Sequence, residues 1–151
     1  MRVFRISLAI YSTKLLASGN PARWNSKDIK IIYTAESRAL ACLENIVHRN
    51  SKGLQKNFRI MEIDVPDKIK IEKIQETDLI ADWKNFDNMP YTQQIGDNWI
   101  NNSKTAVLQV PSVIVTGDFN YLINPAHKDF SSIKLLSVIP FEFDSRIKKE
   151  Q

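Results

Sequence analysis

The sequence predicts an α+β fold, in which short helices pack on a compact mixed sheet. Three observations favour this class: several short segments have strand patterns, few segments have helical ones, and the two kinds do not alternate regularly. Regular alternation would be expected of a doubly wound parallel sheet. A chain of 151 residues suits one domain with a sizeable core, so we expect a single domain over residues 1–151.

The expected strands are rich in β-branched residues or alternate apolar with polar side chains. The clearest is 58–65, where Met61, Ile63 and Val65 alternate with acidic residues, as in a half-exposed strand. Pro140 is expected to break or bend the last strand. In chain order, the predicted strands are 3–7, 29–34, 58–65, 106–110, 112–116 and 133–143.

The strongest helical pattern covers residues 37–49. Leu40, Leu43 and Val47 share one apolar stripe there, which predicts the face that the helix buries. Glu44 falls at the edge of this stripe, one turn from both Leu40 and Val47. A carboxylate in that position is expected to be half-buried.

Weaker helical patterns cover three other segments. Residues 92–101 predict a helix, although Gly96 lowers its helix propensity. Residues 78–83 and 9–18 are expected to be short helical pieces. None of the four glycines lies near another, so no glycine-rich phosphate-binding motif is present. Trp83 and Trp99 recur among apolar positions and are expected in the core.

Charge and composition narrow the class of ligand and the compartment. The net charge of +4 favours an anionic ligand such as a nucleotide, or an acidic partner protein. The basic residues are scattered, so we expect no direct binding of nucleic acid. No apolar run approaches the roughly 20 residues that a membrane helix needs, and the amino terminus lacks a signal-peptide core. Cys42 is the single cysteine, which fits a reducing cytoplasm.

The positions of histidine and cysteine in the sequence disfavour both a metal site and a nucleophilic cysteine. His48 and His127 lie far apart, and no Cys/His cluster has metal-ligand spacing, so no metal site is expected. Cys42 lies on the apolar side of its predicted helix, where a free cysteine usually behaves as a small hydrophobe rather than a nucleophile.

Four polar residues stand in otherwise apolar or aromatic surroundings: Arg23, Tyr33, Glu44 and Ser112. Burying a charge is costly unless it is paired or used, so such positions are candidates for function. Glu44 could stabilise a developing positive charge or bind a ribose hydroxyl, or it could be a rim carboxylate paired with a lysine or arginine. Arg23 could bind a phosphate with its planar guanidinium, or it could stack on Trp24 or another aromatic, or form a surface ion pair.

The other two residues have equally open interpretations. Tyr33 could stack on a flat heterocycle, or it could be an ordinary strand-end tyrosine with its hydroxyl in water. Ser112 could orient a carboxylate or a ligand, or it could simply begin a strand. Nothing in the residues alone connects the four.

Ordered motifs through nearly the whole chain supply that connection. They are Phe4-Arg5-Ile6-Ser7, Arg23-Trp24-Asn25, Ile32-Tyr33-Thr34-Ala35-Glu36-Ser37, Ala39-Leu40-Ala41-Cys42-Leu43-Glu44, Asp82-Trp83, Thr92-Gln93-Gln94-Ile95-Gly96-Asp97-Asn98-Trp99, Leu108-Gln109-Val110-Pro111-Ser112, Asn124-Pro125-Ala126-His127 and Pro140-Phe141-Glu142-Phe143-Asp144-Ser145-Arg146. In this order and spacing the chain resembles the RES-domain family, the toxin half of a bacterial toxin–antitoxin pair. The family name records an Arg, a Glu and a Ser.

The resemblance implies a fold like that of ADP-ribosyltransferase toxins and an activity that depletes cellular NAD by hydrolysis or phosphorolysis. Some members are described as modifying a protein with ADP-ribose. It also implies a cognate antitoxin with a helix-turn-helix (Xre-like) DNA-binding domain that covers the active site. One departure is the segment Asn20-Pro21-Ala22, which stands where the family usually has glycines.

By this resemblance the four polar residues fall on the family's functional positions. Cleavage of the nicotinamide–ribose bond passes through an oxocarbenium-like state, which Glu44 would stabilise. Arg23 would hold the pyrophosphate, Tyr33 would stack on nicotinamide, and Ser112 would hydrogen-bond to Glu44 or the ribose. The predicted catalytic residues are Glu44, Arg23 and Ser112, and the predicted substrate-binding residues are Arg23, Tyr33, Trp24 and Asn25. NAD is then a substrate, and no cofactor is expected.

Three other functions stay open at this point. The chain could transfer ADP-ribose to a protein side chain, it could be a binding module for a nucleotide or an antitoxin without turnover, or it could be an RNA-directed toxin. The basic residues lack the interleaved aromatics of a nucleic-acid groove, which disfavours the third. A homo-oligomer is also compatible with the sequence.

Overall fold

The computed structural model describes residues 1–148 and confirms the α+β class. Its centre is a seven-stranded sheet in the order β4-β5-β6-β2-β1-β3-β7, in which only the β4–β5 pair is parallel. The strands are β1 (Arg2–Leu8), β2 (Ile32–Ala35), β3 (Phe58–Asp64), β4 (Ile71–Lys73), β5 (Val107–Pro111), β6 (Phe119–Ile123) and β7 (Lys134–Phe141). The helices are α1 (Arg38–His48), α2 (Ser51–Leu54) and α3 (Met89–Asn102), with 3₁₀ turns η1 (Ala9–Tyr11), η2 (Glu76–Asp78), η3 (Phe86–Asn88) and η4 (Lys128–Ser132).

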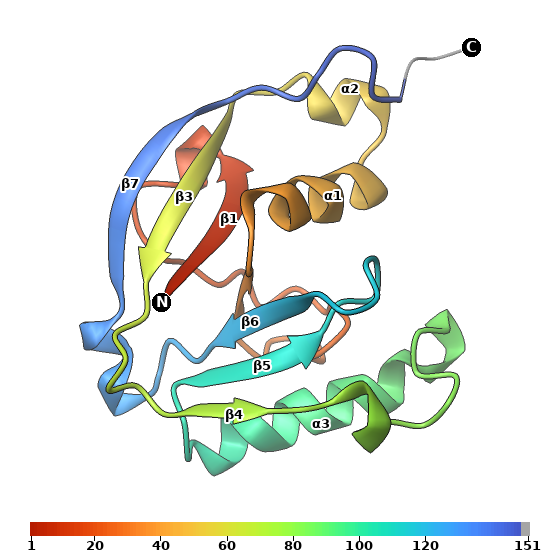
Figure 1. Cartoon of the computed structure of the whole chain (residues 1–151), viewed down its shortest axis with the longest axis vertical. Helices are drawn as coiled ribbons and strands as arrows, with labels where there is room; N and C mark the ends of the chain where they lie inside the picture. Colours follow the sequence, from red (N-terminus) through yellow and green to blue (C-terminus); the bar gives the residue numbers. More distant parts are fainter. Residues whose placement is uncertain (149–151) are drawn as a thin grey trace.

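The sheet consists of two halves that are joined by little backbone pairing. Strand β1 pairs with β3 along its whole length, whereas it pairs with β2 only at Phe4 and Ala35. On the other side of this junction, β2, β6, β5 and β4 form the second half. Figure 1 shows the halves diverging, with α1 on the half that holds β1, β3 and β7, and α3 beside β4 and β5.

Three groups of buried side chains hold these halves. One group is shared, because it includes Val3 of β1, Ile63 of β3, Ile32 of β2 and Ile123 of β6. A second packs between α3 and its half of the sheet: Trp24, Ile31, Trp83, Trp99, Leu108, Val110 and Leu122. A third packs beneath α1: Ile6, Ala35, Leu40, Ala41, Phe58 and Ile60. Each half therefore has its own core, and the predicted burial of Trp83 and Trp99 is confirmed.

Helix α1 begins where the sequence predicts, because the Ser37 hydroxyl accepts a hydrogen bond from the Leu40 amide at 3.0 Å. The predicted buried stripe is wrong in part. Leu40 and Ala41 are buried, but Leu43 and Val47 are largely exposed. The helix therefore turns these two side chains outward, whereas Asn45 between them donates a hydrogen bond to the Ile6 carbonyl of β1 at 3.3 Å.

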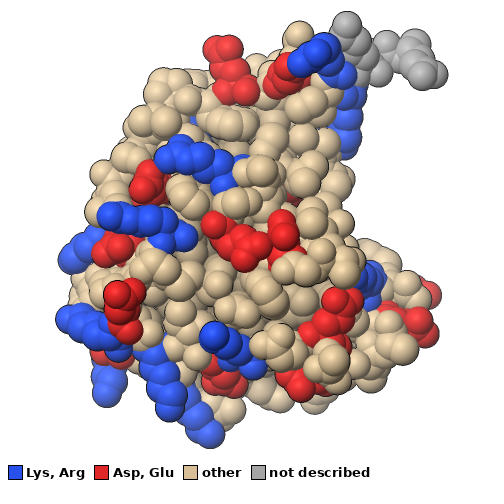
Figure 2. Space-filling view, viewed as in Figure 1, with Lys and Arg blue, Asp and Glu red and all other residues tan. Residues whose placement is uncertain are grey.

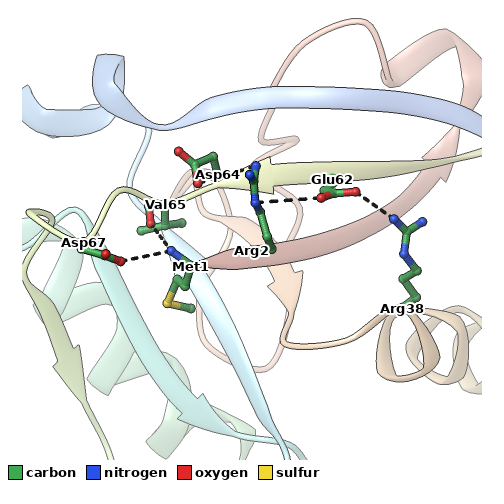
Figure 3. A network of polar contacts seen from close by, with 7 residues as sticks. All are labelled: Met1, Arg2, Arg38, Glu62, Asp64, Val65 and Asp67. Atoms are coloured by element: carbon green, nitrogen blue, oxygen red, sulfur yellow. Dashed lines mark hydrogen bonds and ion pairs between the residues drawn. The ribbon is translucent and has the colours of Figure 1, made fainter.

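Ion pairs tie the start of α1 to the β1–β3 half (Figure 3). Arg38 binds Glu62 of β3 at 2.8 Å, Glu62 also lies 4.0 Å from Arg2 of β1, and Arg2 lies 3.7 Å from Asp64. These side chains are partly exposed, so each pair contributes little to stability. Of these pairs, the one between Arg38 and Glu62 links the first turn of α1 directly to β3.

Helix α3 is confirmed over the predicted residues and runs straight through Gly96. A Cβ atom at Gly96 would lie 1.7 Å from the Trp24 carbonyl oxygen. The absence of a side chain therefore lets the helix press against the backbone at Trp24. The low helix propensity of this glycine is offset by packing that no other residue allows.

Several other predictions were wrong. Residues 112–116 form the loop between β5 and β6, not a strand, and the two strands β4 and β6 had not been predicted. Residues 78–83 are mostly turns, and only η1 is helical within 9–18. Pro140 does not interrupt β7, because β7 is an edge strand where a missing N–H leaves no partner unpaired. The strand's register shift lies elsewhere, opposite Glu62 and Ile63.

No helix within the described residues has the length and apolar character needed to cross a membrane.

Candidate functional site

A large cleft opens where β1 and β2 separate. Its volume is about 1100 Å³, and both strands line it, together with the end of α1, the segment before α3 and the β5–β6 loop. Figure 2 shows the molecule hollowed on this side, between the half that carries α1 and the half that carries α3. A second cavity of about 900 Å³ lies near α2 and the end of β7, and none of the predicted site residues lines it.

The cleft brings together three of the four polar residues singled out in the sequence: Arg23, Tyr33 and Glu44. Trp24, a predicted binding residue, also lines it. Ser112 and Asn25 are not among its lining residues. The roles predicted for all of these residues stay predictions. Their positions divide them into residues that line the cleft and residues that lie behind its walls.

Glu44 projects from the second turn of α1 with 29% of its side chain exposed. Burial raises the pKa of its carboxyl, and a side-chain hydrogen bond with Asn120 opposes that rise. Asn120 of β6 is itself held by a bond that its amide donates to the Thr34 carbonyl at 3.3 Å. Glu44 is therefore a partly desolvated carboxylate held by an amide from the opposite half of the sheet.

His48 lies one turn beyond Glu44, with its Nε2 3.9 Å from the carboxylate. Partial desolvation and the nearby cations Arg49, Lys148 and Arg23 lower the pKa of this imidazole. A lowered pKa leaves His48 largely neutral at pH 7, so it does not neutralise Glu44. The rim-carboxylate interpretation of Glu44, with a lysine or arginine partner, is not what the described residues show.

The Arg23 guanidinium binds three consecutive backbone carbonyls. Its Nη1 donates to Trp83 at 3.2 Å and to Asn85 at 3.1 Å, and its Nη2 donates to Lys84 at 3.1 Å. Burial lowers the pKa of Arg23, and the nearby Tyr33 acts in the opposite direction. A guanidinium has five N–H donors, so two remain available for a ligand. Arg23 thus fixes the segment before α3 to the wall of the cleft.

The Tyr33 hydroxyl is used inside the protein rather than exposed to water. It accepts a hydrogen bond from the Trp24 amide at 3.0 Å and donates to the Asn25 side-chain oxygen at 2.7 Å. Burial raises the pKa of Tyr33, so it stays a neutral phenol throughout the physiological range. With its hydroxyl fixed, its ring lines the cleft in one orientation.

Asn25 holds the loop that carries Arg23. It is 1% exposed, and its amide nitrogen lies within hydrogen-bond distance of the Asn20, Ser26 and Ile29 carbonyls. Its predicted contact with substrate therefore has no support in the geometry, because the side chain faces the loop interior. Trp24 is also buried, and its ring packs 5.9 Å from that of Trp83.

One face of α3 forms hydrogen bonds with the loop that carries Arg23. Thr92 donates to the Arg23 carbonyl at 2.6 Å, and Gln93 donates to the Ala22 carbonyl at 2.9 Å. Asp97 accepts from both the amide and the hydroxyl of Ser26, at 3.0 and 2.5 Å. Pro21 and Ala22 line the cleft, so the Asn20-Pro21-Ala22 departure is part of its rim.

Ser112 lies behind the cleft wall, in the loop between β5 and β6. It is 1% exposed, and its oxygen accepts hydrogen bonds from the amides of Ile114 and Val115, both at 3.1 Å. These bonds shape the loop that presents Val113 and Ile114 to the cleft. Ser112 is thus placed as a support of the wall, and its predicted bond to Glu44 or a ribose stays a prediction.

Sequence reasoning missed two cleft residues that matter here, Asn120 and Phe86. Asn120 lies on β6, one of the two strands that the sequence did not predict. The turn residues Gly117 and Asp118, directly before β6, were a usable signal for the start of that strand. No sequence pattern identifies Phe86 as a cleft residue, because a single aromatic residue in a turn-rich segment is common. Within residues 1–148, no group of three or more His, Cys, Asp or Glu side chains is arranged to hold a metal ion.

Comparison with known proteins agrees with this architecture. Residues 2–144 match the family model described as "RES domain". The chain belongs to the RES-domain family. It is 42% identical over 127 residues to a Sphingobium protein named "Prs ADP-ribosylating toxin", a match that covers 83% of this chain and 79% of that protein. It is also 35% identical over 148 residues to the Yersinia enterocolitica protein "Toxin Res", covering 97% and 96%.

A solved structure shares the fold of this RES-domain chain. A chain of the M. tuberculosis MbcT–MbcA toxin–antitoxin complex superposes with a TM-score of 0.78 at 18% sequence identity. The match covers 93% of this chain and 84% of that one. The expected architecture is therefore confirmed by a fold already seen in a crystal structure.

Proposed function

We propose that this chain is the toxin of a bacterial toxin–antitoxin system and that it cleaves the nicotinamide–ribose bond of NAD. One observation carries the proposal: a partly desolvated carboxylate, Glu44, shares a cleft with Arg23 and Tyr33. Relatives named as toxins, one of them as ADP-ribosylating, support the toxin role and chemistry at the ribose.

The reaction requires a negative group near the ribose. As the bond from the ribose anomeric carbon to the nicotinamide nitrogen breaks, its electron pair stays with nicotinamide and positive charge develops on the ribose. The Glu44 carboxylate stabilises that charge, more strongly than it would in water because it is partly desolvated. An acceptor oxygen then bonds to the same carbon and releases its proton to solvent, which yields ADP-ribose when the acceptor is water.

The rest of the cleft suits a dinucleotide. Arg5, Arg23 and Arg49 line it, against the one carboxylate Glu44, so its charge favours an anionic ligand. The two spare donors of Arg23 would bind the pyrophosphate, and the fixed ring of Tyr33 would stack on nicotinamide. Asn120 orients Glu44 and so acts as a positioning residue.

The acceptor can be water, phosphate or a protein side chain. The protein acceptor is a second candidate because a relative at 42% identity is named an ADP-ribosylating toxin. An antitoxin partner is proposed on the fold shared with a toxin–antitoxin complex. The expected partner has a helix-turn-helix domain, and the expected compartment is the bacterial cytoplasm.

The decisive experiment incubates the purified chain with NAD, with and without phosphate, and follows nicotinamide release by chromatography. Glu44→Gln should reduce the rate by at least about a hundredfold, in the range that removal of a charge-stabilising group costs. Glu72→Gln, an exposed substitution on the edge strand β4, should leave it unchanged. The product, ADP-ribose or its phosphate ester, identifies the acceptor.

Two results would contradict the proposal. The first is equal release by wild type and Glu44→Gln, which would place the chemistry elsewhere. The second is no release in either buffer and no ADP-ribose transfer to protein in a bacterial lysate, which would leave a binding module.

A further inference from the structure

Phe86 is an exposed aromatic residue at the opening of the cleft. The residue is 76% exposed, the largest value among the exposed large hydrophobic residues of the described chain. It lines the cleft that holds Glu44. An exposed phenyl ring on the wall of a ligand-sized cleft offers a flat face on which a planar ligand can stack.

The backbone at Phe86 is fixed rather than loose. Arg23 binds the three carbonyls directly before it, those of Trp83, Lys84 and Asn85. Immediately after it, the Asn88 amide donates to the Asn85 carbonyl at 3.1 Å, and its side chain donates to the Asp82 carbonyl at 2.8 Å. The ring is therefore presented on a rigid turn that leads directly into α3, which lowers the entropy lost when a ligand binds.

The position of Phe86 relative to the other cleft residues indicates which ring of NAD it would contact. Glu44 and Tyr33 are more buried than Phe86, so the ribose and nicotinamide belong at the inner part of the cleft. The pyrophosphate then passes Arg23, whose guanidinium holds the turn that bears Phe86. The flat ring that is left for the outer part is adenine.

We propose that Phe86 stacks on the adenine ring and so favours the dinucleotide over a mononucleotide, and that Arg23 is the positioning residue for it. This inference rests on the proposed function and names the half of the substrate that the outer cleft recognises. Across the opening, Val47 is 51% exposed on α1 and also lines the cleft, so the far side offers an apolar surface too. Stacking on an aromatic face suits any base, and the cations select the phosphates beside it.

The test compares NAD with nicotinamide mononucleotide, which carries the same nicotinamide, ribose and phosphate but lacks the AMP half. Phe86→Ala should raise the KM for NAD about tenfold, as loss of one base–aromatic stack does, with kcat within twofold. Turnover of nicotinamide mononucleotide should be unchanged. Phe86→Trp should retain NAD affinity and Phe86→Leu should not, because only the indole restores a flat face.

Two further variants separate stacking from folding. Ile80→Ala removes another exposed apolar side chain of the same turn-rich segment, one that does not line the cleft, and should leave both substrates unaffected. Arg23→Lys should raise the KM for NAD, because an ammonium on a flexible stem lacks the fixed planar donors that hold three consecutive carbonyls here.

Distinct results would overturn the inference. A KM for NAD within twofold of wild type in Phe86→Ala would do so, as would equal losses for both substrates. Loss of antitoxin binding alone would make Phe86 a protein contact.

If the wild type turns over neither substrate, the proposed function fails, and calorimetric titration with AMP tests the stacking separately. AMP bound equally by wild type and Phe86→Ala would then refute it.

Discussion

At the scale of single residues, Glu44 carries a conflict between stability and function. Burial raises the pKa of its carboxyl, so the ionised form is less favourable in the folded chain than in the unfolded one. Folding stability from this group is therefore present at low pH and is lost as the pH rises through the folded pKa. The proposed reaction needs the ionised form, so the state that would be active is also the one in which this carboxyl lowers the folding stability.

Glu44→Gln should make the protein more stable at pH 7.5, because the amide has no charge to desolvate. We expect a gain of about 0.5 to 1 kcal/mol in the free energy of unfolding, or about 1 to 4 °C in Tm. The gain should shrink toward pH 4, where the wild-type carboxyl is protonated. Thermal denaturation across this pH range measures both effects.

The control for this change is Glu72→Gln, whose carboxylate is exposed and should leave Tm unchanged at every pH. A Glu44→Gln protein that is less stable than wild type at pH 7.5 would show that the bond with Asn120 outweighs the burial.

The sequence predicted which polar residues to examine better than it predicted their contacts. Arg23, Tyr33 and Glu44 do meet in one cleft, although they are dispersed in the chain. Ser112 and Asn25 are buried supports, because their polar atoms are taken up by neighbouring backbone groups. Such contacts depend on how a loop closes, and local pattern does not encode that.

At the scale of elements, α3 is the base on which the Arg23 loop rests. Its contacts with that loop come from Thr92, Gln93, Gly96 and Asp97, which recur at one helical turn. The helix therefore contacts the site through these polar residues and this glycine, in addition to the packing of its buried Trp99.

Gly96→Ala should damage both stability and the site. The added methyl would meet the Trp24 carbonyl oxygen at 1.7 Å, which forces the helix and the loop apart. Overpacking of this kind costs about 1 to 3 kcal/mol. Displacement of Arg23 should also weaken NAD binding, and the two effects are measured by denaturant unfolding and by the KM for NAD.

Asn98→Ala is the matched substitution, since it lies exposed on the same helix and raises helix propensity. It should be neutral or slightly stabilising. If Gly96→Ala behaved like Asn98→Ala, the close contact between α3 and Trp24 would not exist in solution.

Elements with a strong local pattern were predicted, and elements stabilised by their neighbours were not. The cap at Ser37 and the alternation within β3 are local signals, and both elements appear close to their expected bounds. Strand β4 has three residues and depends on pairing with β5. Strand β6 has weak alternation but lies between β5 and β2, so its conformation is dictated by the sheet.

At the scale of the whole molecule, the two halves of the sheet rest on partly separate cores. The cleft walls follow this division, because Glu44 lies on the α1 side and the Arg23 loop on the α3 side. Substitutions in the two separate cores should therefore have independent effects on stability.

Ile60→Val, beneath α1, and Ile31→Val, beside α3, should each cost about 0.5 to 1.5 kcal/mol. Their effects should add to within about 0.5 kcal/mol in the double variant. The comparison pair is Ile60→Val with Ile6→Val, since these residues face each other across β1 and β3 and share one core. Denaturant unfolding of the single and double variants measures the coupling, and strong coupling between Ile60 and Ile31 would contradict the division.

The single backbone pair between Phe4 and Ala35 also has a consequence for how this fold can diverge. With so little pairing at the junction, changes on the α3 side that leave Asn120 in place can accumulate and alter which ligand enters the cleft, while the carboxylate on α1 keeps its bond with that amide. Under the proposed function, ligand choice and bond cleavage are then separately heritable traits of one small domain. Such a division allows descendants of one ancestor to keep the same chemistry and to acquire different targets.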